Sequence, residues 1–150
     1  MSEHRAEVRW SRGSEPFTYE GYPRRHRWRF GGGVALDASS APEYLGDAAL
    51  PNPEEALVAA ISSCHMLTFL AIAARKRLTV ESYDDDAVGH MEKNADGRIA
   101  ITRCELRPRV VFSGERQPSA EEIAKLHESA HRGCFIANSV RTEVTVLPVD

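Results

Sequence analysis

The longest hydrophobic stretch of the chain lies near its middle, over residues 56–74. The four residues before it, Asn-Pro-Glu-Glu at 52–55, form a helix-start signal. Asparagine caps helices, proline fits their first turn, and acidic side chains favour the positive end of the helix dipole. Three cations at 75–77 suit the opposite end. The pattern predicts one long helix from residue 53 to about residue 76.

This predicted helix is apolar on nearly every side, which raises the question of a membrane span. Polar side chains interrupt its middle at Ser62, Ser63, His65 and Thr68, and strand-like segments flank it on both sides. We therefore expect a buried core helix and no membrane partner. A chain of 150 residues covers such a helix with difficulty, so we expect a homodimer that buries it between two subunits.

The remaining segments alternate between hydrophobic and polar residues or carry turn signals. We predict short strands at 4–10, 17–19 and 26–30, a loop at 38–51, a long hairpin of 79–91 and 98–112 around the turn at 94–97, and a last strand at 143–148. Ser119 and Glu122 form a capping box for a second helix that stops near Gly133. Strands on both sides of a central helix favour an α+β fold with antiparallel pairing, as a single domain over residues 1–150.

The charge of the chain is nearly balanced. Its 19 Lys and Arg against 22 Asp and Glu give a formal net charge of -3, so there is no general electrostatic reason to expect a nucleic-acid partner. Four arginines nevertheless crowd together, at positions 24, 25, 27 and 29. Either they occupy solvent-facing positions of a strand that turns Trp28 and Phe30 inward, or one of them serves an active site.

The amino terminus and the cysteines bear on the cellular compartment. Residues 1–5 lead straight into a strand-like segment without the apolar core of a signal peptide, so we expect a cytoplasmic protein with reduced thiols. The three cysteines are widely spaced and include no Cys-x-x-Cys pair, which fits neither a disulfide framework nor a structural zinc module. They are therefore either catalytic or inert buried thiols.

Cys64 lies in the middle of the predicted helix, at helical spacing from hydrophobic residues such as Leu57 and Ile61. A lone cysteine on such a face is usually an inert core residue. Its neighbours Ser63 and His65 are polar groups that a purely structural core would not select. These polar neighbours make Cys64 a candidate catalytic residue.

Cys134 lies at the end of the second predicted helix, directly after His131, Arg132 and Gly133. His131 and Arg132 either supply positive charge beside the thiol or form an ordinary cationic C-terminal turn. Cys104 alternates with hydrophobic residues on a predicted strand, and we interpret it as a buried hydrophobe.

A zinc site is an alternative for the residues around the two candidate cysteines. Cys64, His65, His131 and Cys134 are all of types that bind zinc. Adjacent residues of a helix point about 100° apart and rarely bind one metal together, so we expect no metal site here.

Taken together, these segments resemble the OsmC/Ohr family of hydroperoxide reductases. The resemblance is carried by the run Asn-Pro-Glu-Glu-Ala-Leu at 52–57, by Cys64 ten residues after Glu54, and by Cys134 at a helix end with Asn138 four residues later. It covers nearly the whole chain, because the predicted elements follow the family's order. It implies a two-layer α+β fold with antiparallel sheets and a long buried central helix, in an intertwined homodimer with active sites at the subunit interface.

The resemblance also implies roles for particular residues. Cys64 is the thiolate that a hydroperoxide oxidises to sulfenic acid, Cys134 is the resolving thiol that traps it as a disulfide, and Glu54 is the acid of the site. The family's arginine is best matched by Arg24, in the run Tyr-Pro-Arg-Arg-His at 22–26. Arg24 would hold the thiolate and stabilise the leaving alkoxide, while a carboxylate orients its guanidinium.

The position of Glu54 adds a condition. Ten residues of one continuous helix rise about 15 Å, so the carboxylate cannot touch Cys64 of its own chain. We expect Glu54 to serve Cys64 of the partner subunit, and the alternative is that it only favours its own helix N-terminus.

The implied substrates are organic or lipid-like hydroperoxides, because Leu, Ile, Met and Phe surround Cys64 in the sequence. No bound cofactor is implied, since an external dithiol such as a dihydrolipoyl protein or thioredoxin would reduce the disulfide. Three departures from better-known members indicate a distinct subgroup: His65 replaces phenylalanine, Phe135 replaces proline and Ala137 replaces serine. A non-enzymatic member that binds an apolar ligand or senses oxidants through its thiols is the alternative function.

Overall fold

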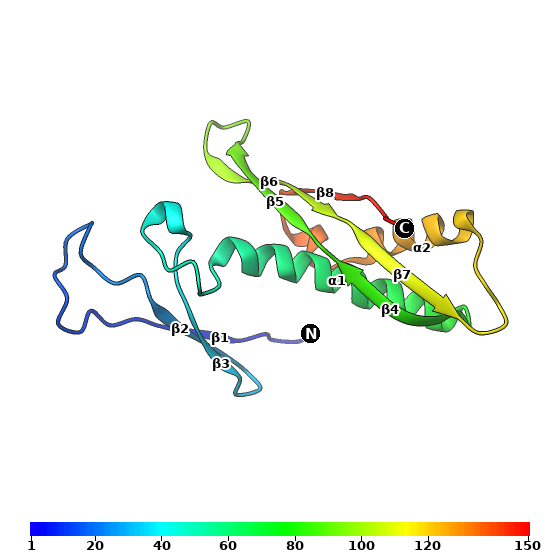
Figure 1. Cartoon of the computed structure of the whole chain (residues 1–150), viewed down its shortest axis with the longest axis horizontal. Helices are drawn as coiled ribbons and strands as arrows, with labels where there is room; N and C mark the ends of the chain where they lie inside the picture. The colour runs from blue at the N-terminus through cyan, green and yellow to red at the C-terminus, as the bar shows by residue number, and fades with distance from the viewer. The chain divides into compact units, whose positions relative to one another are not determined.

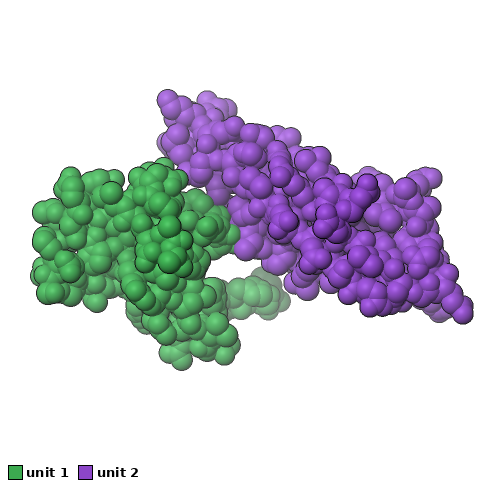
Figure 2. Space-filling view, viewed as in Figure 1, with its two compact units in different colours: residues 1–56 green, residues 57–150 purple.

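The computed structural model describes all 150 residues, which divide into two compact units, 1–56 and 57–150 (Figure 2). Unit 1 holds β1 (Ala6–Arg9), β2 (His26–Phe30), β3 (Ala35–Ala38) and the 3-10 turn Pro42–Tyr44. Helix α1 (Pro53–Arg75) begins in unit 1 and continues into unit 2, which holds β4 (Thr79–Asp85), β5 (Val88–Lys93), β6 (Ile99–Leu106), β7 (Pro108–Ser113), α2 (Ala120–Gly133), the 3-10 turn Ala137–Ser139 and β8 (Glu143–Val146) (Figure 1). The single domain expected over residues 1–150 stays a prediction.

Unit 1 contains an antiparallel meander in the order β1-β2-β3. The strands predicted at 4–10 and 26–30 are confirmed as β1 and β2. The strand predicted at 17–19 is wrong, because this segment is a turn in which the Thr18 carbonyl accepts hydrogen bonds from the amides of Gly21 and Tyr22. Strand β3 begins just before the predicted loop, and its sequence, Ala-Leu-Asp-Ala, has little β propensity.

The arginines of β2 face outward, in agreement with one of the two interpretations of the cluster. Arg27 and Arg29 are exposed. Asp37 of β3 pairs with Arg25 at 2.5 Å and with Arg27 at 3.0 Å, and hydrogen bonds from these guanidinium groups lower the pKa of the Asp37 carboxyl. These charges are therefore engaged in pairing within unit 1.

The same interpretation turns the aromatic residues of β2 inward, and this is true only in part. Trp28 is half-buried, but Phe30 is 44% exposed, so the inward orientation predicted for Phe30 is wrong. Phe30 is the last residue of β2 and pairs only with Ala6 of β1, because the pairing with β3 stops one residue earlier.

Helix α1 confirms the predicted central helix. The Asn52 side chain accepts a hydrogen bond from the Glu55 amide at 2.9 Å, and the Glu55 carboxylate accepts one from the Asn52 amide at 3.1 Å. This reciprocal capping satisfies two amides that the helix leaves free at its start. One unbroken helix therefore carries both Glu54 and Cys64.

The long hairpin predicted after α1 is confirmed, but it is divided in two. Strand β4 pairs with β7 and β5 pairs with β6, both antiparallel. Gly97 has the left-handed conformation (φ 75°) that the turn at 94–97 requires. Strand β8 confirms the last predicted strand but runs parallel to β6, so the sheet β5-β6-β8 is mixed rather than antiparallel.

The first hydrophobic cluster of unit 2 joins both helices to the β4-β7 pair. Phe69 and Ala73 of α1 pack with Leu126 and Ala130 of α2, and side chains of β4 and β7 pack against them. One face of this strand pair is therefore turned toward the helices.

A second cluster joins α1 to the sheet β5-β6-β8. Ile61 packs against Cys104 and Leu106 of β6. Gly89 of β5 lies so close to the helix that a Cβ there would be 2.6 Å from Cγ2 of Val58. By length and composition alone α1 could cross a membrane, yet it contributes to both clusters, as core helices do. The mixed α+β fold with a long central helix is thus confirmed.

Candidate active site

Cys64 and Cys134 are neighbours where α1 meets α2. Cys64 comes from the middle of α1 and is partly exposed, whereas Cys134 caps the end of α2 and is 1% exposed. Both thiols are free. Gly133, which precedes Cys134, packs against Thr68, one turn after Cys64, and the Cys64 thiol is near enough to raise the pKa of the Cys134 thiol. The fold thus brings together the two cysteines that are predicted to form a redox pair.

Cys134 is held in place by main-chain groups. Its amide donates to the His131 carbonyl at 3.3 Å, and its Sγ accepts a hydrogen bond from the Ala137 amide at 3.4 Å. Burial raises the pKa of the Cys134 thiol, the Ala137 amide lowers it, and the neighbouring Cys64 thiol raises it, with a net upward shift. Cys134 is therefore protonated at neutral pH and has to release a proton when its sulfur attacks.

Gly133 lets the two helices approach closely beside the thiols. A Cβ at this position would lie 3.1 Å from Cγ2 of Thr68. Thr68 is itself fixed, because its hydroxyl donates a 2.9 Å hydrogen bond to the Cys64 carbonyl. The glycine that was predicted to stop the second helix therefore also sets the spacing between the two cysteine-bearing segments.

Beside the thiols, His65 of α1 meets His127 of α2. Nε2 of His65 lies 3.1 Å from Nδ1 of His127, and the rings stack at 5.4 Å between centroids with an interplanar angle of 8°. The two side chains are 1% and 4% exposed. Burial lowers the pKa of each to about 4, and at His65 the neighbouring His127 and His131 lower it further. Both imidazoles are therefore neutral at pH 7.

Several buried polar atoms around this pair have no hydrogen-bond partner: Nδ1 of His65, Nε2 of His127, Nδ1 of His131 and the hydroxyl of Tyr83. Burial raises the pKa of Tyr83, and the carboxylate of Asp85 raises it further. Asp85 accepts hydrogen bonds from the Ser62 hydroxyl and from the Arg107 amide. A polar cluster from α1, α2 and β4 thus lies inside unit 2, and the neutral imidazoles of His65 and His127 supply no positive charge to the thiols.

The sequence patterns do not single out His127, Tyr83 or Asp85. One signal was present, because His127 precedes His131 by four residues and so lies on the same face of α2. Arg132 points elsewhere: its side chain is 68% exposed and pairs with Glu128 at 3.3 Å. Of the two interpretations of Arg132, the ordinary cationic turn fits the structure.

Cys104 is fully buried in the cluster with Ile61 and Leu106. Burial raises the pKa of its thiol to about 11, with smaller contributions from nearby carboxylates. This agrees with its interpretation as a buried hydrophobe. No three or more His, Cys, Asp and Glu side chains are arranged to hold a metal ion, and His65 faces His127 instead.

Glu54 and Arg24 belong to unit 1, whereas both cysteines belong to unit 2. Glu54 lies in the first turn of α1, ten residues before Cys64 on the same unbroken helix. The rise of about 15 Å along these residues keeps its carboxylate away from Cys64 of its own chain. The role of Glu54 stays a prediction.

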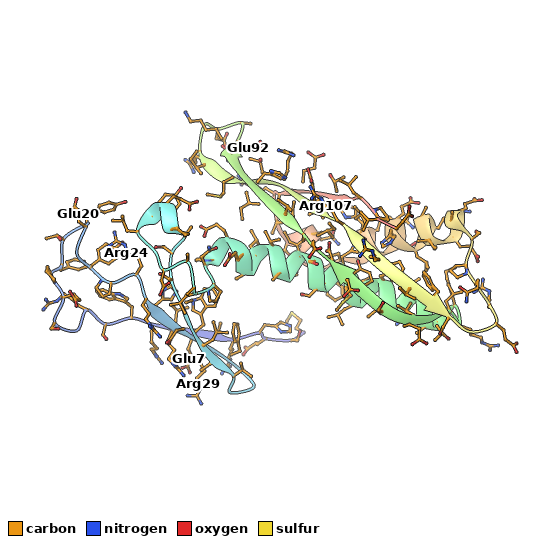
Figure 3. All side chains as sticks on the ribbon, in the orientation of Figure 1. Glu7, Glu20, Arg24, Arg29, Glu92 and Arg107 are labelled. Carbon is orange, nitrogen blue, oxygen red and sulfur yellow. The ribbon has the colours of Figure 1, made fainter.

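Arg24 is held among aromatic rings in unit 1 (Figure 3). Its guanidinium carbon lies 3.7 Å from the centroid of the Tyr22 ring and 5.2 Å from that of Tyr19, and its terminal nitrogens donate to the carbonyls of the same two residues. Trp10 and Phe17 pack with Tyr22 in this cluster. Nε of Arg24 is buried without a hydrogen-bond partner. Its role as the active-site cation also stays a prediction.

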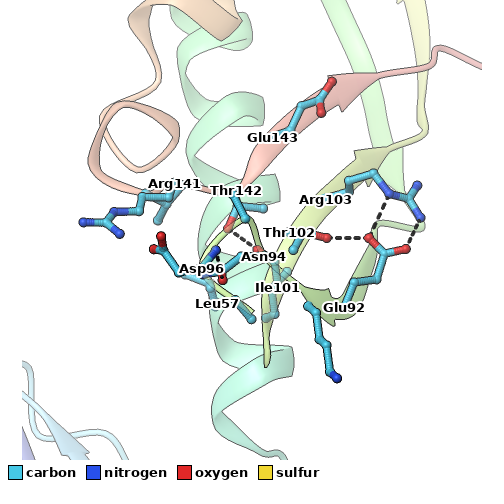
Figure 4. A pocket seen from close by; sticks show the side chains of 14 residues that line it. Leu57, Glu92, Asn94, Asp96, Ile101, Thr102, Arg103, Arg141, Thr142 and Glu143 are labelled. Atoms are coloured by element: carbon cyan, nitrogen blue, oxygen red, sulfur yellow. Dashed lines mark hydrogen bonds and ion pairs between the residues drawn. The ribbon is translucent and has the colours of Figure 1, made fainter. Parts of the chain in front are cut away.

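A groove of about 800 Å³ lies between the β5-β6 turn, the start of β8 and Leu57 of α1 (Figure 4). Neither Cys64 nor Cys134 lines it. Two of its charged side chains pair, because Glu92 binds Arg103 at 3.0 Å, and Glu92 also accepts a hydrogen bond from the Thr102 hydroxyl. We assign this groove no role.

The sequence matches the family model for OsmC-like proteins over residues 46–147. An OsmC-like protein of unknown function from Vibrio cholerae is 51% identical, with a TM-score of 0.96 over 99% of this chain and 100% of that chain. Two organic hydroperoxide resistance proteins are more distant. The one from Elizabethkingia anophelis is 16% identical (TM-score 0.76, 100% and 97% covered), and the one from Bacillus subtilis is 17% identical (TM-score 0.66, 99% and 98% covered). No curated protein matches the sequence.

These findings carry different weight. The two distant likenesses show a shared fold, whereas the family model covers about two thirds of the chain and the Vibrio cholerae protein is similar over nearly its full length. The order of strands and helices, with one cysteine inside α1 and another at the end of α2, agrees with the resemblance read from the sequence. This chain therefore belongs to the OsmC-like protein family.

Proposed function

We propose that this protein is a cytoplasmic thiol peroxidase that reduces organic or lipid-like hydroperoxides. The observation that carries the proposal is the closeness of two free thiols from different helices, one partly exposed and one buried, where Gly133 packs against Thr68. Such a pair passes between dithiol and disulfide with little movement of the chain, because the sulfurs are already neighbours.

The reaction then has two steps. The Cys64 thiolate attacks one oxygen of the hydroperoxide, the O–O bond breaks, the alkoxide leaves as an alcohol after taking a proton, and Cys64 becomes a sulfenic acid. The Cys134 sulfur next attacks the Cys64 sulfur, and the departing hydroxide takes the Cys134 proton and leaves as water. An external dithiol, such as a dihydrolipoyl protein or thioredoxin, reduces the resulting disulfide.

An apolar side chain beside the thiols supports an organic substrate. Phe135 directly follows Cys134 and is 79% exposed. A bulky apolar hydroperoxide can contact this side chain, whereas hydrogen peroxide gains nothing from it.

The test is a turnover assay that compares cumene hydroperoxide with hydrogen peroxide, using dithiothreitol and then dihydrolipoamide as reductant. We expect multiple turnovers and a higher kcat/KM for cumene hydroperoxide. One equivalent of this peroxide should link Cys64 to Cys134 and leave Cys104 free, as peptide mapping can show. Oxidation that stops at one equivalent would instead indicate a non-enzymatic redox sensor, and a main disulfide through Cys104 would contradict the pairing.

We also propose a homodimer, because a single chain covers α1 incompletely. Of the most apolar 18-residue stretch of α1, only 22% is buried inside the chain. Exposed residues recur at every fourth position along one side of the helix: Glu55, Ala59, Ser63, Leu67, Ala71 and Arg75. A second copy of the chain would cover this stripe and place the active site near the subunit interface.

Within such a dimer, Glu54 is expected to act on Cys64 of the partner subunit, through Arg24. Mixing inactive Cys64→Ser chains with inactive Glu54→Ala chains should restore part of the activity, because one of the two sites in a mixed dimer then has an intact Cys64 and an intact Glu54. The measurement is turnover after co-refolding, with dimer formation checked by sedimentation at low micromolar concentration. If confirmed mixed dimers of two inactive variants regain nothing, the shared site is ruled out.

A further inference from the structure

We propose that the reduced Cys64–Cys134 pair also binds trivalent arsenicals that carry a single organic group. The proposal goes beyond peroxide reduction and does not depend on it, because it needs only two free thiols on segments that Gly133 and Thr68 bring together. Arsenic(III) with one carbon substituent has two further bonds to make, and two cysteine sulfurs can supply both.

The pair is arranged for chelation before any ligand arrives. Gly133 packs against Thr68 beside the sulfurs, and the buried His65–His127 contact joins the same two helices. The ring of Phe69 lies 4.5 Å from that of His127 and continues this contact into the hydrophobic cluster. Two helices held in this way lose little conformational entropy when a ligand bridges them. The free energy of forming the two bonds is therefore offset only slightly by ordering of the chain.

The number of available thiols selects the class of ligand. Cys104 belongs to the separate cluster on β6 and is fully buried, so no third sulfur reaches the pair. No set of three or more metal-ligating side chains is present, which disfavours zinc with its four ligands. The site therefore suits a ligand that binds only two sulfur atoms.

The surroundings favour an organic substituent on the arsenic. The side chain of Phe135 is exposed beside Cys134 in the chain and can contact an aryl group. Cys64 is the entry point because it is partly exposed, and the adjacent buried Cys134 closes the chelate.

The bonding step conserves oxidation states. Each thiol S–H is replaced by an S–As bond, and the two protons leave with the oxygen of the arsenous group as water. Arsenic stays trivalent and both sulfurs stay reduced, so no oxidant or reductant takes part. In the bound form neither Cys64 nor Cys134 is a free thiol, so peroxide cannot oxidise the pair until a competing dithiol removes the arsenic.

The experiment titrates the fully reduced protein with phenylarsine oxide and follows bound arsenic by intact-mass spectrometry. We expect one arsenical per chain and loss of two titratable thiols. Cys64→Ser and Cys134→Ser should each weaken binding by about 10²-fold or more, because the second bond no longer forms within one molecule. Cys104→Ala is the matched control and should bind like the unaltered chain, and circular dichroism verifies that each variant is folded.

Two results would overturn the proposal. One is a folded Cys134→Ser protein that binds phenylarsine oxide as tightly as the unaltered chain, and the other is arsenic bound to the sulfur of Cys104. Zinc ions that compete with phenylarsine oxide at equal concentration would also contradict the selectivity for two-sulfur ligands. The peroxide assay is a separate readout. A chain that binds the arsenical but does not turn over cumene hydroperoxide keeps this inference and loses the proposed peroxidase function.

Discussion

Replacing Cys64 by serine is expected to abolish hydroperoxide turnover, with kcat/KM lowered by at least about 10³-fold. The hydroxyl of serine does not ionise near neutral pH and cannot replace a thiolate as the group that breaks the O–O bond. The measurement is the formation of cumyl alcohol from cumene hydroperoxide with dithiothreitol in excess. Retained turnover in Cys64→Ser would remove Cys64 from the mechanism.

The other two cysteines make this prediction specific. Cys134→Ser should still produce about one equivalent of alcohol, because the first step needs only Cys64, and repeated exposure should then carry Cys64 to sulfinic acid. Cys104→Ala should keep its turnover, because this residue lies in a separate hydrophobic cluster. Mass spectrometry of the Cys64 peptide distinguishes the disulfide from the overoxidised product.

Acidification is expected to cost the protein several kcal/mol of stability as two buried imidazoles take up protons. The pKa values of His65 and His127 are about 4 in the folded chain against 6.5 for a free imidazole. The unfolded chain therefore binds more protons between these values, and stability falls as the pH decreases from about 6.5 to about 4. Each histidine contributes a loss of stability of about 3 kcal/mol at most. The combined loss is less than twice this value, because protonation of one imidazole influences the other.

Urea unfolding followed by circular dichroism, at one protein concentration and from about pH 7 to about pH 4.5, measures this loss. His65→Phe should reduce the slope in this window by roughly half, because one of the two titrating groups is gone. His4→Asn is the control, since His4 is exposed near the chain terminus. Glu92 affects only the acid end of this range, because its pKa is lowered from 4.5 to about 2 and its contribution to stability is lost between these two values. If the free energy of unfolding changes with pH equally in the unaltered chain and in His65→Phe, the pH dependence does not come from His65.

Local signals predicted most of the fold. The starts of both helices and the turn at 94–97 are confirmed because their chemistry is contained in a few adjacent residues. The errors come from distant partners. Phe17 packs with Trp10 and Tyr22 in a turn instead of extending as a strand, and β8 pairs in parallel with β6, which lies far from it in sequence.

The candidate site was predictable only where a family pattern supplied the long-range contact. The meeting of Cys64 with Cys134 depends on how α1 packs against α2, which no local pattern contains, and the resemblance provided it. The same resemblance did not include His127, whose partner His65 replaces the phenylalanine of better-known members. Its burial follows from the packing of Phe69 and Tyr83 around it, a property of the folded chain alone.

The absence of a side chain at position 133 constrains how this lineage can change. A methyl group on residue 133 would lie 3.1 Å from Cγ2 of Thr68, which is tied to the carbonyl of Cys64, so the neighbouring groups would have to move by a few tenths of an ångström beside the two sulfurs. The hydrophobic cluster around Phe69 and Leu126 would persist through such a shift. Drift at this position would therefore disturb the closing of the disulfide before it disturbs the fold, and selection for redox activity would favour the smallest residue there.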